Sequence, residues 1–352
     1  MLMKSVTIQS HYHDPAIQWI DVRSPIEYQE DHIFASINFP VLTDEERHEV
    51  GELYRDDKER AKSIAFQYGE EKVHLLESLL KTISQSGKTI GFYCYRGGLR
   101  STVPAKFFSE RGYQVVKLEG GYKAYRNFVR SSLYELSAKR SFVVLHGYTG
   151  VGKSEALNLL KDGGYPILHL ESLAQNGGSL FGDLLYRKDS PSQKRFESLL
   201  LESLYPQNQQ RIFVEMESRR IGRITVPEDL YQSIVNSPMH ILMETTFDCR
   251  IRRILNDYLP PQQSLEPNHY MKINEKITLF KKSLGSLQVK HLLNLAEQNN
   301  YYELVKILLE KHYDPLYRKS VESFKNQSMI FRYTDLPSEL LPWLEKHKVL
   351  RD

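Results

Sequence analysis

Hydrophobic and polar positions alternate in two ways along the chain up to residue 130. Short apolar runs at 17–22, Thr89–Tyr93 and Val115–Leu118 are typical of buried strands, and each run leads into polar or glycine-rich residues. Helix-type spacing covers residues 44–62, 70–84 and 104–111. Strands that alternate with helices predict a parallel sheet within an α/β unit.

A second α/β alternation begins at Ser141–His146, where an apolar run leads into glycines. Further strands are expected at 167–170, Arg211–Glu215 and Met239–Glu244, and residues 122–140 are expected to form a linking helix. From residue 247 onward the strand signals stop. Helical patterns with interleaved Lys and Arg then cover 250–258, 269–284 and 286–310.

These patterns predict two α/β domains. The first spans residues 1–138 and includes the linking helix, and the second spans residues 139–352 with a helical region from about 247 to 352. A chain of 352 residues suits two domains, and 41% hydrophobic with 26% charged residues argues against disorder. The formal net charge of +3 permits an anionic partner without requiring one.

The cellular compartment is indicated by what the sequence lacks. No apolar run approaches the ~20 residues that cross a membrane, and the N-terminus has no apolar segment of the signal-peptide kind. The chain contains two cysteines, Cys94 and Cys249, which excludes a disulfide framework and a cysteine-rich zinc site. A cytoplasmic protein in a reducing environment is therefore expected. Cys249 precedes a helical arginine run, and we interpret it as a packed thiol.

Cys94 stands at the end of an expected strand, in the segment FYCYRGGLRS of residues 92–101. A loop of this kind aims backbone N–H groups, and the next helix from about Ser101, at whatever the sulfur carries, which favours the nucleophilic thiolate. Two arginines add positive charge, and two glycines permit a tight turn. The expected catalytic residue is Cys94, and the expected anion-binding residues are Arg96, Gly97, Gly98 and Arg100.

Two families share features of this loop. The spacing from Cys94 to Arg100 is C-x5-R, as in cysteine-dependent phosphatases. Residues 20–41 read IDVRSPIEYQEDHIFASINFPV, a run that resembles a rhodanese domain, the sulfur-transfer fold that Cdc25-type phosphatases share. Loop length favours the phosphatase, whereas Tyr93 stands where phosphatases generally place a histidine. A Cdc25-like cysteine phosphatase or a sulfurtransferase, fused to an ATPase, is therefore kept as the alternative function.

Residues 147–154 match the phosphate-loop pattern G-x-x-x-x-G-K-[ST], after a strand and before a helix. The lysine would bridge phosphate oxygens, and Ser154 would hold Mg²⁺ if a metal is present. The expected phosphate-binding residues are Gly147, Gly150, Gly152, Lys153 and Ser154, and the acidic residues expected at the end of a later strand are Glu215 and Glu217. Such a loop reads phosphates rather than bases, so it accepts another diphosphate ester as readily as ATP, whose binding is left open.

A rhodanese unit joined to a P-loop unit resembles the tRNA 2-selenouridine synthase family over nearly the whole chain. The segments that carry the resemblance are 40–47, 50–51, 94–101, 120–123, 147–155, 170–171, 178–179, 181–182, 217–219, 221–222 and 313–317. Two departures occur: Gly177 replaces an expected basic residue, and Met216 interrupts an expected Glu-Asp-Glu run. The resemblance implies a rhodanese-like parallel-sheet domain, then a P-loop NTPase-like α/β domain with a helical C-terminal region.

For activity, the resemblance implies that selenium replaces sulfur in 2-thiouridine at the wobble position of certain tRNAs. Selenophosphate would be the selenium donor, and S-geranyl-2-thiouridine, made from geranyl diphosphate, would be an intermediate. Cys94 would carry selenium as a perselenide, and the phosphate loop would hold a diphosphate. The implied partners are a tRNA with wobble 2-thiouridine and an enzyme that produces selenophosphate.

Contacts to tRNA require clustered positive charge, because a net charge of +3 is small for a nucleic-acid ligand. The candidates are Lys123, Arg126 and Arg130, which share one face of the linking helix by their spacing, then Arg219, Arg220 and Arg223, and Arg250, Arg252 and Arg253. A non-catalytic RNA-binding module with a decayed rhodanese is a further alternative, and the intact Cys94, Lys153 and Ser154 argue against it.

Overall fold

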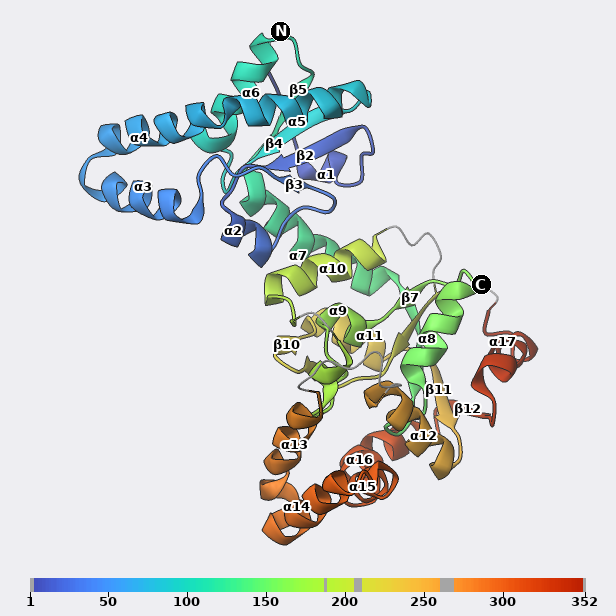
Figure 1. The fold of residues 1–352 in the computed structure, drawn as a ribbon. Coiled ribbons are helices and arrows are strands. Elements are labelled where there is room, and N and C mark those ends of the chain that lie inside the picture. The colour runs from blue at the N-terminus through green and yellow to red at the C-terminus, as the bar shows by residue number, and fades with distance from the viewer. Residues whose placement is uncertain (1–2, 187–188, 206–210, 260–268, 351–352) are drawn as a thin grey trace. The chain divides into compact units, whose positions relative to one another are not determined.

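The computed structural model describes residues 3–186, 189–205, 211–259 and 269–350 (Figure 1). The chain forms two compact units. The first holds Met1–Leu133 and Ser192–Glu202, and the second holds Tyr134–Pro191 and Ser203–Asp352. The expected division near residue 138 does not place the segment Ser192–Glu202 with the N-terminal part, which is where the structure puts it.

A five-stranded parallel sheet forms the centre of the first unit (Figure 1). Its order is β1-β5-β4-β2-β3, with β1 at Lys4–Val6, β2 at Ile17–Asp21, β3 at Ile37–Asn38, β4 at Thr89–Tyr93 and β5 at Val115–Leu118. Side chains alternate between the two faces of a sheet. Ile20 and Phe92 accordingly pack in one core cluster with residues of two helices, whereas Trp19 and Tyr93 contact each other in an edge-to-face arrangement.

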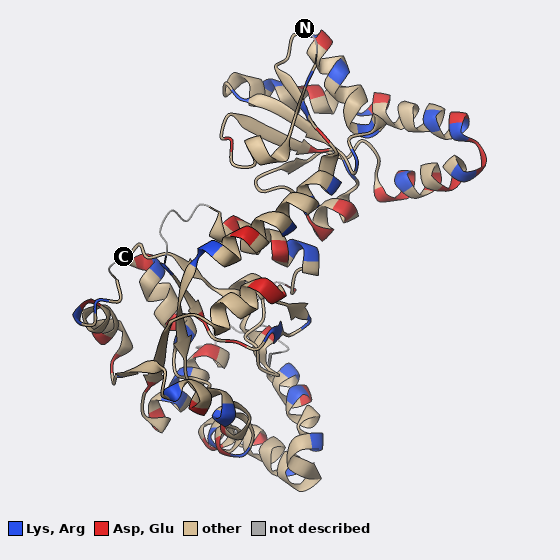
Figure 2. Cartoon of the chain, turned by 180° about the vertical axis from the view of Figure 1, so that it is seen from behind, with Lys and Arg blue, Asp and Glu red and all other residues tan. Residues whose placement is uncertain are grey.

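Eight helices of the described chain contribute to the first unit. They are α1 (Ile8–His11), α2 (Pro25–Glu30), α3 (Asp44–Asp56), α4 (Lys58–Glu71), α5 (Val73–Gln85), α6 (Leu99–Glu110), α7 (Gly121–Lys139) and α10 (Gln193–Leu204). Helices α3 and α4 form a hairpin that projects from the sheet and carries charges of both signs (Figures 1 and 2). The expectation of one helix over 44–62 is wrong, because Asp57 has extended backbone and its Oδ1 accepts a hydrogen bond from the N–H of Arg60, capping a new helix.

The second unit has its own five-stranded parallel sheet, in the order β12-β11-β6-β8-β7. The bounds are Ser141–His146 for β6, Ile167–Leu168 for β7, Arg211–Glu215 for β8, Met239–Glu244 for β11 and Ser328–Arg332 for β12. A small antiparallel hairpin joins β9 (Arg220–Ile221) and β10 (Ile224–Thr225). The two sheets confirm the predicted α/β class with parallel sheets.

Helices pack around this second sheet and continue as a helical region (Figure 1). They are α8 (Lys153–Asp162), α9 (Leu170–Ala174), η1 (Gly182–Leu185), α11 (Glu228–Val235), α12 (Phe247–Tyr258), α13 (His269–Leu279), α14 (Lys281–Glu297), α15 (Tyr301–Leu308), η3 (Leu309–Tyr313), α16 (Asp314–Lys325) and α17 (Leu336–Lys346). Two buried clusters result: β6, β11 and β12 share one with α8 and α17, and helices α12 to α15 share the other.

The expectation that no strand follows residue 247 is wrong. Strand β12 pairs in parallel with β11 at the edge of the second sheet. Its apolar run is only the three residues Met329, Ile330 and Phe331, which is too short for the sequence pattern to identify a strand. The predicted helix over 286–310 also divides, because Asn299 has φ of 56° and Asn300 caps α15. None of the described helices has both the length and the apolar character needed to span a bilayer.

Candidate functional sites

Cys94 is the first residue after strand β4, and its side chain lies at the floor of the loop that leads to α6. The Sγ lies 3.1 Å from the Oγ of Ser101 and 3.8 Å from the carbonyl oxygen of Gly98. Only 3% of Cys94 is exposed. The Oγ of Ser101 also donates to the carbonyl oxygen of Gly98 at 3.2 Å. The sequence did not reveal this contact of Ser101, because it placed the start of the helix there; α6 begins two residues earlier, at Leu99.

Helix α7 holds the cysteine loop through its first backbone groups. The N–H of Tyr122 donates to the carbonyl oxygen of Cys94 at 2.8 Å, and the N–H of Lys123 donates to that of Tyr95 at 2.9 Å. Gly121 has φ of 60°, and a Cβ at this position would lie 2.2 Å from the carbonyl oxygen of Cys94. Only glycine permits this close approach, which fixes the loop against the helix.

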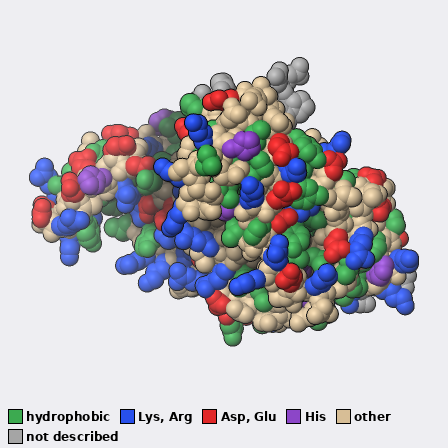
Figure 3. All heavy atoms as spheres, turned by 90° about the horizontal axis from the view of Figure 1, so that it is seen from below, with side chains coloured by type: hydrophobic (Ala, Val, Ile, Leu, Met, Phe, Trp, Pro, Cys, Tyr) green, Lys and Arg blue, Asp and Glu red, His purple; other side chains and the backbone are tan. Residues whose placement is uncertain are grey.

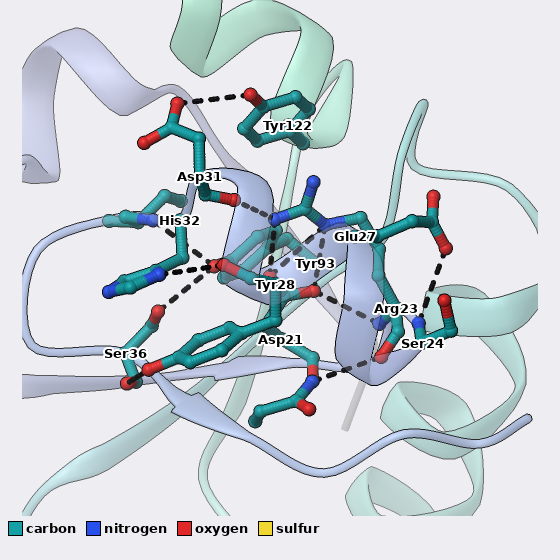
Figure 4. Close-up of polar contacts among 12 residues, drawn as sticks. Asp21, Arg23, Ser24, Glu27, Tyr28, Asp31, His32, Ser36, Tyr93 and Tyr122 are labelled. Carbon is teal, nitrogen blue, oxygen red and sulfur yellow. Dashed lines mark hydrogen bonds and ion pairs between the residues drawn. The ribbon is translucent and has the colours of Figure 1, made fainter. Parts of the chain in front are cut away.

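A buried polar network contacts Tyr122, near the start of α7, and Figure 4 shows its residues. Both carboxylate oxygens of Asp21 accept hydrogen bonds from the guanidinium of Arg23, with Nη2 to Oδ2 at 2.6 Å. The same Nη2 donates to the carbonyl oxygen of Asp31 at 2.7 Å, and the guanidinium lies over the ring of Tyr122 at 3.8 Å. Arg23 of the Asp-Val-Arg motif therefore holds Tyr122 in place near the start of α7, the helix whose first N–H groups bind the cysteine loop.

Positive charge around the cysteine loop is only partly neutralised. Arg100 donates to the Glu27 carboxylate at 2.7 Å. Burial alone would raise the pKa of Glu27, but the hydrogen bond and charge of Arg100 outweigh it and hold this pKa below its usual value. Arg96 is exposed and has no ion-pair partner within the part of the chain that the structure describes. Lys117, which the sequence did not single out, donates to the carbonyl oxygen of Gly97 at 3.3 Å.

The phosphate loop connects β6 to α8, as its sequence pattern predicts. Gly150 has φ of 78°, and a Cβ there would lie 2.8 Å from the carbonyl oxygen of Arg250, so no side chain fits. Lys153 and Ser154 are both engaged by carboxylates. The Nζ of Lys153 lies 3.4 Å from Oε1 of Glu217, and the Oγ of Ser154 donates to Oε2 of Glu171 at 3.0 Å.

Three carboxylates gather beside the phosphate loop: Glu171, Glu215 and Glu217. The backbone N–H of Glu171 donates to Oε1 of Glu215 at 2.9 Å. Burial, and then the neighbouring charge of Glu217, raise the pKa of Glu171 to about 8, and burial with the charge of Glu171 raises that of Glu215 well above its usual value. Lys153 shows the opposite balance: burial lowers its pKa, but Glu217 and Glu171 more than compensate. Burial and the neighbouring negative charges thus favour the protonated forms of Glu171 and Glu215.

Glu171 is a further site residue to which the sequence analysis assigned no role, although residues 170–171 are among the segments that carry the family resemblance. It lies in a five-residue helix after the short strand β7. His169 lies nearby, with Nε2 4.0 Å from Oε1 of Glu215, and burial and the charge of Lys161 lower its pKa to about 4. His169, Glu171 and Glu215 each offer a ligand atom within 4.8 Å of the others. Both predicted acids, Glu215 and Glu217, do lie at the phosphate loop.

Two of the basic residues nominated for tRNA are buried in ion pairs, which corrects those predictions. Arg126 is 7% exposed and pairs with Asp31 at 3.3 Å and with Glu197. It therefore points into the first unit and does not share a solvent face with Lys123 and Arg130, which are both exposed. Arg250 is 6% exposed and pairs with Asp314 at 2.5 Å.

The other nominated arginines differ in their exposure and in whether a carboxylate pairs with them. Arg253 is mostly buried and pairs with Glu155 at 2.7 Å, so it too belongs to the phosphate loop's surroundings. Arg252 is exposed and pairs with Asp248 within its own helix. The residues at the β9–β10 hairpin are all exposed: Arg219, Arg220 and Arg223. Acidic and basic side chains are interspersed over the face shown in Figure 3, so positive charge is local rather than general.

A central parallel strand that ends in a cysteine loop, and a second one that ends in a phosphate loop, define a two-domain enzyme of the rhodanese and P-loop classes. Family models agree with this description: residues 7–128 match the rhodanese-like domain, and residues 140–350 match the AAA domain of tRNA 2-selenouridine synthase. The chain belongs to the tRNA 2-selenouridine synthase family, as the sequence resemblance predicted.

Curated relatives match over nearly their whole length. The tRNA 2-selenouridine synthase of Shewanella halifaxensis is 30% identical over 93% of this chain and 94% of its own, and that of Bdellovibrio bacteriovorus is 29% identical over 92% and 93%. Among solved structures, a rhodanese-related protein from Thermoplasma volcanium is 22% identical over 35% of this chain and 89% of its own, with a TM-score of 0.22. That structural similarity is too low to carry an argument.

Proposed function

We propose that this enzyme replaces the sulfur of wobble 2-thiouridine in tRNA by selenium, and that it does so through an S-geranyl intermediate. The observation that carries the proposal is the presence, in one chain of this family, of a cysteine loop with Cys94 at its floor and a complete phosphate loop. Selenophosphate is the proposed selenium donor, and geranyl diphosphate is the proposed ligand of the phosphate loop.

The phosphate loop would serve the first step. Lys153 and the backbone N–H groups of the loop bind the diphosphate, which displaces Glu217 from the lysine. The sulfur of 2-thiouridine attacks C1 of the geranyl group, so that a C–S bond forms, the C–O bond breaks and diphosphate leaves with the electron pair. The alkylated sulfur is then a better leaving group than the original thiocarbonyl sulfur.

Mg²⁺ fits the donor atoms beside this loop. The hydroxyl of Ser154 and the carboxylates of Glu171 and Glu215 are hard oxygen ligands of the kind that Mg²⁺ prefers. Oε2 of Glu215 is buried and accepts no hydrogen bond from any described residue, which leaves it available to a cation. When bound, the ion would neutralise charge on the diphosphate. We assign ATP no role.

The cysteine loop would serve the second step. Attack of the Cys94 thiolate on selenium forms an S–Se bond as the Se–P bond breaks. The Se–P electron pair leaves on phosphorus, so that phosphorus is reduced from P(V) to P(III) and departs as phosphite while sulfur and selenium are oxidised to the S–Se level. Attack of that selenium on C2 of the base expels geranylthiol. We assign the release of Cys94 to two molecules of a low-molecular-weight thiol, which leave as their disulfide and supply the two electrons that cleave the S–Se bond.

The direct test is mass spectrometry of nucleosides after thiolated tRNA is incubated with the protein, geranyl diphosphate, selenophosphate and a thiol. We expect S-geranyl-2-thiouridine when selenophosphate is omitted and 2-selenouridine when both co-substrates are present. Absence of both products would refute the proposal. Turnover of p-nitrophenyl phosphate that depends on Cys94 would instead support the phosphatase alternative.

A further inference from the structure

An apolar pocket in the second unit has no role in the function proposed so far. It lies between α12, α13 and α15 and opens to solvent at its mouth. Aliphatic side chains of two helices form much of its wall: Ile254 and Leu255 from α12, and Leu304, Val305 and Leu308 from α15. None of the described lining residues carries a charge. Apolar pockets with few polar groups in their lining are typical sites of small apolar ligands.

The pocket meets the phosphate loop at two separate segments. Thr149 of the phosphate loop lines the pocket, and the next residue is Gly150. Ser179 also lines it, and the preceding Gly178 lies against Glu217, the partner of Lys153: a Cβ at Gly178 would lie 2.9 Å from Oε2 of Glu217. In both segments one residue borders the pocket and its neighbour borders the phosphate site. A single ligand can therefore occupy both.

Two arginines fix the pocket wall to the phosphate loop. The Nε of Arg250 donates to the carbonyl oxygen of Thr149 at 2.8 Å, and Nη1 of Arg253 donates to that of Gly150 at 3.0 Å. Both arginines belong to α12, the helix that contributes Ile254 and Leu255 to the pocket. These hydrogen bonds set the distance between an anionic head group in the loop and an apolar tail in the pocket.

We infer that this pocket receives the hydrocarbon chain of a prenyl diphosphate whose head group occupies the phosphate loop; the inference rests on the proposed geranyl transfer. Each methylene that leaves water for an apolar site strengthens binding by about fourfold. A purine base is the competing occupant, and its ring nitrogens need hydrogen-bond partners, for which the lining offers only the hydroxyls of two small residues and three tyrosines. Two of the polar lining groups are already paired with each other, since the hydroxyls of Ser179 and Tyr258 lie 3.1 Å apart.

The test compares prenyl diphosphates of different length with two variants that change the pocket in opposite directions. Leu304→Phe narrows it, and Leu308→Ala widens it. Leu287→Phe, at a position that is 85% exposed on α14, is the matched control. The readout is the ratio of kcat/KM for geranyl to that for dimethylallyl diphosphate, and for farnesyl to geranyl diphosphate. A ratio does not depend on the fraction of folded enzyme.

We expect Leu304→Phe to lower the geranyl to dimethylallyl ratio by at least about tenfold, and Leu308→Ala to raise the farnesyl to geranyl ratio. Inhibition by inorganic diphosphate should stay unchanged in both variants. If both ratios equal those of the wild type and of Leu287→Phe, the pocket assignment is overturned while geranyl transfer stands. If the wild-type enzyme transfers no prenyl group from any of the three diphosphates, the proposed geranyl transfer itself fails.

Discussion

Strand β4 delivers Cys94 and strand β6 delivers the phosphate loop from the centre of a parallel sheet, and a helix follows each loop. Around Cys94 the fixed contacts are a neutral hydroxyl and backbone groups, and the exposed Arg96 has no carboxylate partner among the described residues. Around the phosphate loop, Lys153 and Ser154 are already bound by carboxylates. An anion can thus enter the first loop directly, whereas in the second it must displace acidic side chains.

The largest effect is expected from a variant that removes the reactive sulfur of the cysteine loop and leaves the phosphate loop unchanged. Cys94→Ser should reduce 2-selenouridine formation by at least about a thousandfold, because the serine oxygen cannot form the S–Se bond. Geranylation of thiolated tRNA should persist at the wild-type rate, since the phosphate loop is untouched. Nucleoside mass spectrometry reports both products from one reaction. Cys249→Ser is the control and should retain both activities, and selenouridine formed by Cys94→Ser at the wild-type rate would show that selenium never resides on this sulfur.

The converse variant acts on the phosphate loop. Lys153→Ala should slow geranylation by about a hundredfold, because one charge-assisted contact to the diphosphate is lost and Glu217 is left without its partner. Transfer of selenium from selenophosphate to Cys94, measured as a mass increase of the intact protein, should be unaffected. Lys161→Ala, at an exposed lysine near the end of the same helix, is the matched control. A wild-type rate of geranylation in Lys153→Ala would show that this loop does not bind the diphosphate.

The sequence predicted those parts of the two sites whose residues lie close together along the chain. Both loops were found because their glycines, cations and reactive groups lie in one short segment. The strands Arg211–Glu215 and Met239–Glu244 were predicted with their true bounds, because apolar runs with charged ends mark buried parallel strands.

What the sequence did not predict depends on partners far apart in the chain. Arg126 has helix spacing typical of a solvent face, and only folding shows that Asp31 and Glu197 bury it. Glu171 reaches Ser154 across 17 residues, and no local pattern reveals that its carboxylate is buried beside the phosphate loop. Patterns of period 2 and 3.6 describe which face is buried, but they do not reveal which charge neutralises another.

A third prediction concerns how stability depends on pH, because a tyrosine precedes the cysteine loop and a histidine precedes the phosphate loop. Tyr93 precedes Cys94, and burial raises its pKa well above the usual value, so it stays neutral. His146 precedes Gly147, and burial, His240 and Lys153 lower its pKa from 6.5 to about 3. Between pH 6.5 and about 3, His146 binds a proton in the unfolded chain but not in the folded one. Its contribution to the free energy of unfolding is therefore fully present above pH 6.5 and is lost as the pH falls toward 3. The slope reaches about 1.4 kcal/mol per pH unit for this one group.

The two tryptophans allow the units to be followed separately, because Trp19 lies in the first and Trp343 in the second. Urea unfolding is recorded by fluorescence at pH 7.5 and pH 5, with Trp19→Phe or Trp343→Phe as background. The Trp343 signal should lose more stability on acidification, and His146→Gln should reduce that loss. His48→Gln, at an exposed position, is the control. An equal loss in His146→Gln would place the acid sensitivity elsewhere.

The smallest expected effect concerns the tRNA, which must reach both loops. Arg130→Ala in the first unit and Arg220→Ala in the second each remove an exposed charge, and each should weaken tRNA binding by about two- to fourfold and lower the salt dependence by about one phosphate contact. Arg126→Ala should differ in kind: it removes the nearest cation from the buried Asp31, which keeps only hydroxyl donors and the more distant Arg195. The free energy of unfolding should fall by about 3 kcal/mol with no change in salt slope. Titration of labelled tRNA at several salt concentrations, with unfolding measured alongside, distinguishes the two outcomes. An altered salt slope in Arg126→Ala, at unchanged stability, would restore this residue to the tRNA surface.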